Sequence, residues 1–199
     1  KILDDNGLKV VGSHIGYEKL RDSLDYELEY NLTVGNHRLI LPYYKMESMD
    51  DAKRAAEFLN ETYAKVKNSG AKIGYHNHSF EFETRAEGKR YIDVMLAETI
   101  PEIFFEFDVY WVSYADQDPI ATIKANAGRV DLVHLKELAV DLPKRNVEIG
   151  SGKLDFAGII KTAKECGTAD FVVEQEDYTL PDLDSCKASF EGLKKLNLL

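Results

Sequence analysis

The chain has 199 residues, enough for one sizeable hydrophobic core, and a formal net charge of −10. No apolar run is long enough to span a membrane, the first residues lack the layout of a secretion signal, and the acidic balance disfavours a nucleic acid as partner. We therefore expect a single cytoplasmic domain over residues 1–199 that binds neither membranes nor nucleic acid.

Short apolar runs alternate with helical patterns along the whole chain. The predicted strands are Lys9–Ser13, Arg38–Pro42, Lys72–His76, Ile103–Asp108, Val130–Leu135 and Asp170–Gln175. Several lack polar–apolar alternation, which is typical of strands buried on both faces of a parallel sheet. Six strand–helix repeats predict an α/β domain. A doubly wound sheet and an eight-stranded barrel both fit, although no G-x-G-x-x-G loop follows any strand.

The predicted helices have readable ends. Ser48 and Asp51 form a capping-box-like start, and Gly70 supplies the stop of the same helix. Asp118 and Pro119 open another helix as N-cap and first-turn proline. Apolar stripes predict further helices from Tyr17 to Gly35, from Phe156 to Gly167 and from Leu183 to Leu196.

Polar side chains cluster where the predicted strands end. They are His14 after the first strand, His76, Asn77, His78 and Glu81 after the third, Asp108 and Trp111 after the fourth, His134, Lys136 and Glu137 after the fifth, and Glu174, Gln175, Glu176 and Asp177 after the sixth. In a parallel α/β barrel, the C-terminal strand ends face the active site. This positional bias predicts a functional site at that edge.

Three of these residues indicate a metal. Asp108, His134 and Glu174 each close an apolar run, where an unpaired charge is costly to bury. A divalent cation would offset the repulsion between converging carboxylates, and mixed oxygen and nitrogen ligands suit Mn²⁺, Mg²⁺, Co²⁺ or Zn²⁺. For each residue alone a simpler alternative holds: Asp108 caps the next loop, His134 is a hydrogen-bonded core residue, and Glu174 pairs with Lys136. The shared position of all three favours the metal.

The same stretches carry a family resemblance. In order and spacing, GYHNHSFEF, FEFDVYWV, VHLKE, EIGSGKLDF and VVEQED resemble the sugar phosphate isomerase/epimerase family, the xylose isomerase-like TIM barrels. The opening GLKVVGSHIGYEKL is similar to that family's third strand and following helix. The resemblance implies a (β/α)8 barrel with one divalent metal at its C-terminal face. It also implies Glu, Asp, His and Glu ligands on strands five to eight, with the two glutamates often forming the acid/base pair.

Only some of the family's metal ligands have a counterpart in this sequence. The aspartate falls on Asp108, the histidine on His134 and the last glutamate on Glu174, but the first glutamate has no counterpart. His76 holds the equivalent strand-end position. Either His76 replaces that glutamate as a metal ligand, or Glu81 reaches back from the loop to do so, or water takes that coordination position.

Length is a second departure from the family pattern. If Lys9–Ser13 is the third barrel strand, the first two strands are not in this chain, and six β/α units remain. A six-stranded barrel of this type leaves two open edges. The chain is then a fragment, an open barrel, or one that a partner covers, for example as a homo-oligomer.

The function that these residues and the resemblance imply is metal-dependent proton abstraction next to a carbonyl in a sugar, keto-sugar or inositol-like substrate. The outcome would be isomerisation, epimerisation or dehydration. Glu174 is the expected ligand and base, with His76 or Glu81 on the opposite face. His14, His78, Lys136 and Trp111 are expected to contact substrate, against the simpler alternatives of loop capping, a solvated loop, an ion pair with Glu174 and packing.

Two other classes of function stay open at this point. One is a non-catalytic sugar-binding or interaction protein, an alternative that the lost glutamate and the missing strands raise. The other is a DNA-repair enzyme of the endonuclease IV type, which needs several zinc ions and a basic surface. Five histidines and a net charge of −10 argue against it.

Overall fold

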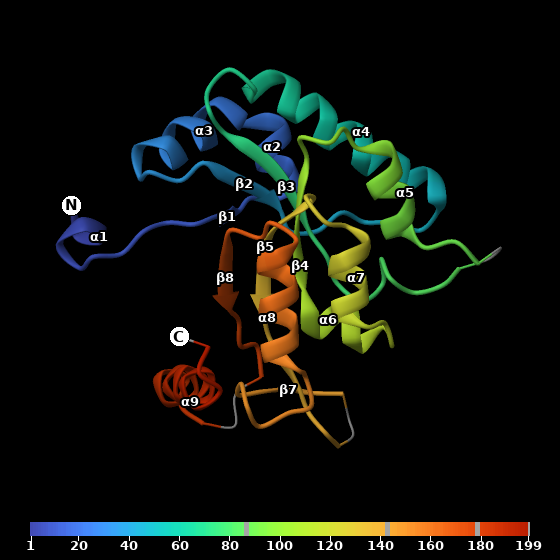
Figure 1. Ribbon diagram of the computed structural model, residues 1–199. Helices are drawn as coiled ribbons and strands as arrows, with labels where there is room; N and C mark the ends of the chain where they lie inside the picture. Colours follow the sequence, from blue (N-terminus) through green and yellow to red (C-terminus); the bar gives the residue numbers. More distant parts are fainter. Residues whose placement is uncertain (86–87, 142–143, 178–179, 199) are drawn as a thin grey trace. The chain divides into compact units, whose positions relative to one another are not determined.

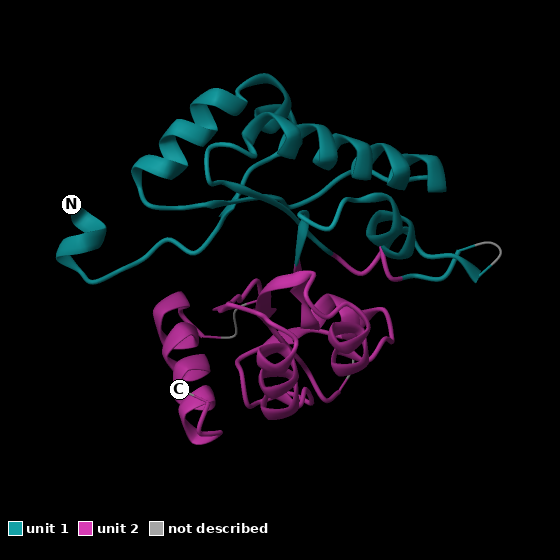
Figure 2. Cartoon of the chain, turned by 45° about the horizontal axis from the view of Figure 1, so that its top comes forward, with its two compact units in different colours: residues 1–77, 83–105 teal, residues 78–82, 106–199 magenta. Residues whose placement is uncertain are grey.

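The computed structural model describes residues 1–85, 88–141, 144–177 and 180–198. The chain forms two compact units, which Figure 2 distinguishes by colour. Unit 1 comprises residues 1–77 and 83–105, and unit 2 comprises residues 78–82 and 106–199. Within the described part of the chain, none of the helices combines the length and hydropathy that a bilayer-spanning segment requires.

The sheet order follows the chain order. The strands are arranged β1-β2-β3-β4-β5-β8, and β6 and β7 form a separate two-stranded hairpin. Figure 1 colours the helices and strands in chain order. Helices lie between the strands along the chain, so the predicted α/β class with parallel strands is confirmed. Strand β4 (Phe104–Asp108) begins in unit 1 and ends in unit 2.

Unit 1 contains three parallel strands and their helices. The strands are β1 (Ser13–His14), β2 (Arg38–Leu41) and β3 (Lys72–His76). The helices are α1 (Ile2–Asp5), α2 (Tyr17–Asp22), α3 (Leu24–Thr33), α4 (Met49–Val66) and α5 (Tyr91–Glu98). The register pairs His14 with Ile40 and Leu41 with Tyr75, so the C-terminal ends of these strands lie at one edge.

Helix α4 shows how the sequence builds unit 1. The Ser48 hydroxyl accepts a hydrogen bond from the Asp51 backbone N–H at 3.2 Å, which confirms the predicted N-terminal cap. Its buried face carries Ala52, Ala55, Ala56, Leu59 and Val66, and it packs against α5 and β3. The small alanines let the helix approach the sheet closely.

Unit 2 contains the end of β4, the pair β5 (Val130–Leu135) and β8 (Asp170–Val173), and the hairpin β6 (Glu137–Leu138) and β7 (Asn146–Val147). Its helices are α6 (Val109–Tyr114), α7 (Pro119–Ala125), α8 (Phe156–Glu165) and α9 (Asp182–Lys195). Asp118 caps α7 by accepting from the Ile120 N–H at 2.8 Å, as predicted. Strand β5 runs parallel to β8 with His134 opposite Val172.

Several element boundaries differ from the predicted ones. Strand β1 covers only Ser13–His14, and β8 ends at Val173, two residues before the predicted Gln175. The predicted helix from Tyr17 to Gly35 divides at Ser23, which is the C-cap of α2 and the N-cap of α3. The sequence interpretation missed α5, α6 and the β6–β7 hairpin, which are short elements without a full apolar period.

A close contact inside unit 1 yields a stability prediction. A Cβ added at Gly74 would overlap the Phe104 ring, so an alanine there must displace a rigid side chain. We expect Gly74→Ala to lower the free energy of unfolding by about 1–3 kcal/mol in urea denaturation. Gly16→Ala is the control, because a Cβ there meets open space. Equal stability of the two variants would contradict the packing described here.

Candidate functional site

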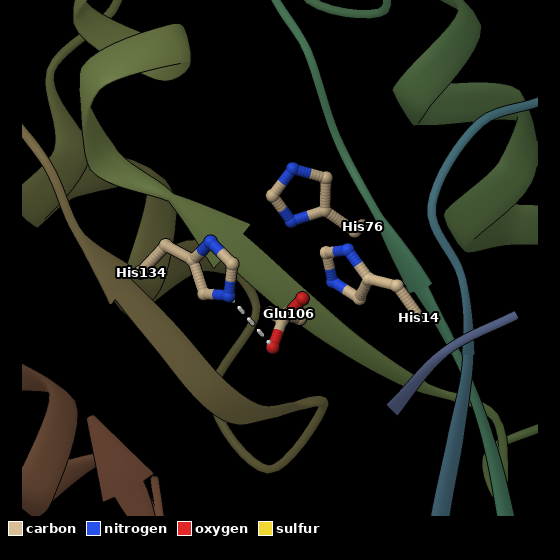
Figure 3. A group of neighbouring side chains, drawn as sticks. All are labelled: His14, His76, Glu106 and His134. Carbon is tan, nitrogen blue, oxygen red and sulfur yellow. Dashed lines mark ion pairs between the residues drawn. The ribbon is translucent and has the colours of Figure 1, made fainter. Parts of the chain in front are cut away.

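His134 lies between two carboxylates of unit 2. Its Nε2 is 3.1 Å from Glu106 Oε1, the pair joined by the dashed line in Figure 3, and its Nδ1 is 3.2 Å from Glu174 Oε2. Burial lowers the pKa of His134, but the hydrogen bonds to Glu106 and Glu174 outweigh it and raise the pKa to about 10. The His134 ring is therefore an imidazolium between two carboxylates at neutral pH.

Asp108 is fully buried at the end of β4. Its Oδ1 accepts hydrogen bonds from the backbone N–H groups of Tyr110 at 2.8 Å and Trp111 at 3.3 Å, so it caps α6. Burial raises the pKa of Asp108 well above its ordinary range, although the charges of Lys136 and His134 oppose that rise. A cation closer to Asp108 would stabilise the ionised form of this buried carboxyl group.

Unit 2 brings the predicted ligand triad together. One ligand atom from each of Asp108, His134 and Glu174 lies within 4.8 Å of the other two. Strand geometry explains this, because β5 pairs with β8 in a register that places Glu174, just past β8, beside the end of β5. The contacts of the simpler alternatives are present as well: Asp108 caps α6, and Glu174 contacts Lys136.

Lys136 is fully buried beside the triad. Its Nζ is 3.4 Å from Glu174 Oε2 and also pairs with Glu176. The ammonium lies 5.0 Å from the ring centroid of Tyr110 and 4.8 Å from that of Trp111. Two carboxylates and two aromatic faces thus hold one positive charge at the end of β5.

His14 and His76 are neighbours within unit 1. Their ring centroids are 4.8 Å apart, and both rings are drawn in Figure 3. His14 is the last residue of β1 and His76 is the last residue of β3. Both therefore lie at the C-terminal strand edge, where the sequence predicts functional groups. His76 is buried, whereas His14 is exposed.

Residues 78–82, the later part of the run GYHNHSFEF, belong to unit 2. The fully buried Glu81 accepts a hydrogen bond from the His78 backbone N–H at 2.9 Å, so it closes its own loop. The His78 ring centroid lies 5.5 Å from that of Trp111. The two sequence-predicted residues His78 and Trp111 are therefore neighbours within unit 2.

Sequence reasoning overlooked Glu106. It is buried, contacts His134 directly, and lies two residues before Asp108 in the run FFEFD. Because side chains two apart on a strand share a face, an acidic residue inside an apolar run at that spacing was the available signal.

Glu137, which the sequence also places at the end of the fifth strand, shapes the loop after β5. The Glu137 carboxylate accepts hydrogen bonds from the N–H groups of Leu138, Gly150 and Leu154. The Asn146 amide oxygen accepts from the Glu176 N–H at 2.7 Å. These bonds fix the chain around the hairpin and hold Glu176 near Lys136.

Comparison with known proteins decides the family. The sequence profile of the xylose isomerase-like TIM barrels matches residues 1–196. The chain belongs to this family. Among curated proteins, it is 30% identical over 101 residues to the inosose dehydratase of Clostridium beijerinckii. That match covers 50% of this chain and only 32% of the dehydratase.

Solved structures of the family share the fold. A sugar phosphate isomerase/epimerase from Parabacteroides distasonis is 26% identical, with a TM-score of 0.80 over 96% of this chain and 78% of its own. The IolI protein, solved with a zinc atom, is 14% identical, with a TM-score of 0.71 over 95% of this chain and 76% of its own. The second likeness shows the fold alone.

Proposed function

We propose that this xylose isomerase-like protein is a divalent-metal-dependent isomerase, epimerase or dehydratase acting on a sugar, keto-sugar or inositol-like substrate. The observation that carries the proposal is the convergence of Asp108, His134 and Glu174 within unit 2. The names of the relatives agree with it, since they include a sugar phosphate isomerase/epimerase and an inosose dehydratase.

The donor set fits a metal. Asp108, His134 and Glu174 offer carboxylate oxygen and imidazole nitrogen, the ligands of Mn²⁺, Mg²⁺, Co²⁺ and Zn²⁺. Burial has raised the pKa of the Asp108 carboxyl, and the imidazolium of His134 now neutralises two carboxylates. A divalent cation would supply that compensating charge in place of the ring proton. Zinc in the related IolI structure is consistent with this choice.

When bound, such a cation polarises a substrate carbonyl and favours the charge that develops on proton abstraction. Glu174 is the proposed base, because its side chain is 28% exposed whereas those of Glu106 and His134 are nearly buried. Lys136 lies against Glu174 and offers an ammonium to a substrate oxygen. His76 or Glu81 is the proposed second proton carrier, and His14, His78 and Trp111 are proposed substrate contacts.

The test of the proposal has two steps. Protein purified without chelators is analysed for bound metal, and keto-sugars and inososes are then screened by NMR for deuterium uptake from D₂O. A metal-bearing protein that exchanges a carbon-bound proton supports the enzyme. Sugar binding without exchange or metal would instead establish a non-catalytic sugar-binding barrel.

Metal binding should release protons. Because the pKa of His134 is raised to about 10, its ring is protonated at neutral pH and must lose that proton to bind a metal. Affinity for Mn²⁺ should therefore rise with pH from 7 to the region of that pKa. Calorimetric titrations in buffers of different ionisation enthalpy should reveal the released protons. Affinity that falls as pH rises would exclude His134 as a ligand.

The role of His76 gives a separate prediction from the sequence pattern. If His76 occupies the position of the family's first glutamate, His76→Ala should weaken Mn²⁺ binding by about 10–100-fold, the loss typical of a perturbed metal site. His76→Glu should restore binding and flatten its pH dependence near neutrality, because a carboxylate is already ionised there. Unchanged metal affinity in His76→Ala, together with lost sugar binding, would assign His76 to the substrate.

A further inference from the structure

A pocket lies at the C-terminal strand edge of unit 1. Its volume is about 390 Å³, and it is lined by residues that follow β1 and β2. Gly16, Tyr17 and Glu18 come after β1, Pro42 to Lys45 come after β2, and Asp51 belongs to α4. The volume lies in the range of small-molecule sites, and the edge is where parallel α/β proteins bind ligands.

Tyrosine rings dominate the lining. Tyr17 and Tyr44 meet edge to face with ring centroids 5.3 Å apart, and Tyr17 also packs on Phe58 at 4.6 Å. These contacts fix Tyr17 and Tyr44 as a rigid wall. Tyr43 is 51% exposed and supplies a more accessible ring. Rigid aromatic faces bearing phenol hydroxyls suit a ligand with one apolar face and several hydroxyl groups.

The charges around the pocket do not favour an anion. Lys45, which lines the pocket, pairs with Glu47 at 3.0 Å, and the lining residue Asp51 pairs with Arg54. Arg21, which lies over the Tyr17 ring, pairs with Asp22 at 2.6 Å. Asp51 also accepts from the Ser48 hydroxyl and the Glu47 N–H. Glu18 adds a further negative charge. A phosphate here would meet compensated cations and nearby carboxylates.

We propose that this tyrosine-lined pocket binds the ring of a neutral saccharide. The C–H face of a pyranose packs on the exposed ring of Tyr43 and the wall formed by Tyr17 and Tyr44. Its hydroxyl groups bond to the phenols and to Glu18 at the rim. The residues that line this pocket all belong to unit 1 and include none of the proposed metal ligands Asp108, His134 and Glu174. The inference can therefore be tested independently of the proposed reaction.

Saturation-transfer NMR on the full chain tests the pocket. The probes are the methyl glycosides of glucose, galactose, mannose and xylose, with glucose 6-phosphate as the charged comparison. At least one neutral glycoside should receive saturation more strongly than the phosphate. Tyr43→Ala should weaken its binding by about fivefold, the loss expected from one stacking face, and Tyr43→Phe should keep most of it.

Two controls separate this inference from its alternatives. Tyr30→Ala removes another exposed tyrosine, outside the pocket, and should leave binding unchanged. Glu174→Gln and chelator-treated protein should bind the glycoside as the wild type does, even if the metal proposal fails. Stronger transfer to glucose 6-phosphate, no transfer to any glycoside, or undiminished binding in Tyr43→Ala would each overturn the saccharide pocket.

Discussion

Replacing Glu174 with Gln is expected to lower the rate of substrate deuterium exchange by about 10²–10⁴-fold, the contribution of a positioned general base. Glutamine preserves the length of the side chain and its oxygen near Lys136, but it cannot take up a proton at neutral pH. The measurement is the exchange rate in D₂O by NMR, with whichever keto-sugar or inosose the wild type turns over.

Glu176→Gln is the matched control for this variant. Glu176 also pairs with Lys136, but its side chain is 51% exposed and it does not belong to the proposed triad. We expect exchange within a few-fold of the wild-type rate, in line with a partly exposed ion pair. Wild-type exchange in Glu174→Gln would remove Glu174 from the mechanism, and equal losses in the two variants would point to Lys136 instead.

Asp108→Asn is expected to act in opposite directions on metal binding and on stability. Asparagine still caps α6 through its side-chain oxygen, but it brings no buried negative charge. Because burial raises the pKa of Asp108 in the folded chain, folding is disfavoured as pH rises from the unfolded value of about 3.9 towards the folded one. At pH 7, the metal-free variant should therefore melt at a higher temperature than the wild type.

The same substitution should abolish stabilisation by metal. Wild-type protein should gain about 2.7 kcal/mol at a free Mn²⁺ concentration one hundred times its dissociation constant. The variant, lacking a ligand, should show almost no shift. Thermal unfolding with and without Mn²⁺ measures both effects. A variant that melts well below the metal-free wild type, or that keeps the full metal shift, would contradict the role given to Asp108.

A buried, charged cluster that lowers the stability of the folded chain is typical of a functional site. Glu106, Asp108 and Glu174 place three carboxylates near one imidazole, an arrangement that packing alone does not favour. Perturbed pKa values at such clusters are a recognised mark of functional sites. Binding a cation would offset the burial cost and the mutual repulsion of these carboxylates.

The order of strands and helices along the chain was predictable from local sequence patterns. Strand β3 has the predicted bounds Lys72–His76, and the caps at Ser48 and Asp118 hold as expected. These features depend on residue type and spacing alone. Because strand ends in a parallel sheet share an edge, the proximity of Asp108, His134 and Glu174 also followed from their places on the strands.

Other features depend on tertiary contacts that no local pattern encodes. Helix α6 begins directly at Asp108, so one residue serves as strand end, helix cap and candidate ligand. The β6–β7 hairpin pairs only two residues on each side and is held by the buried Glu137 and Asn146. The position of Glu106 in the run FFEFD was visible in the sequence, but its contact with His134, which is distant in the sequence, was not.

Anomalous X-ray diffraction from crystals grown with Mn²⁺ tests the central claim most directly. We expect one anomalous peak, with a carboxylate oxygen of Asp108, a ring nitrogen of His134 and a carboxylate oxygen of Glu174 each within roughly 2–2.6 Å of it. Crystals that show no peak there, with His134 still between Glu106 and Glu174, would contradict the metal site and the function built on it.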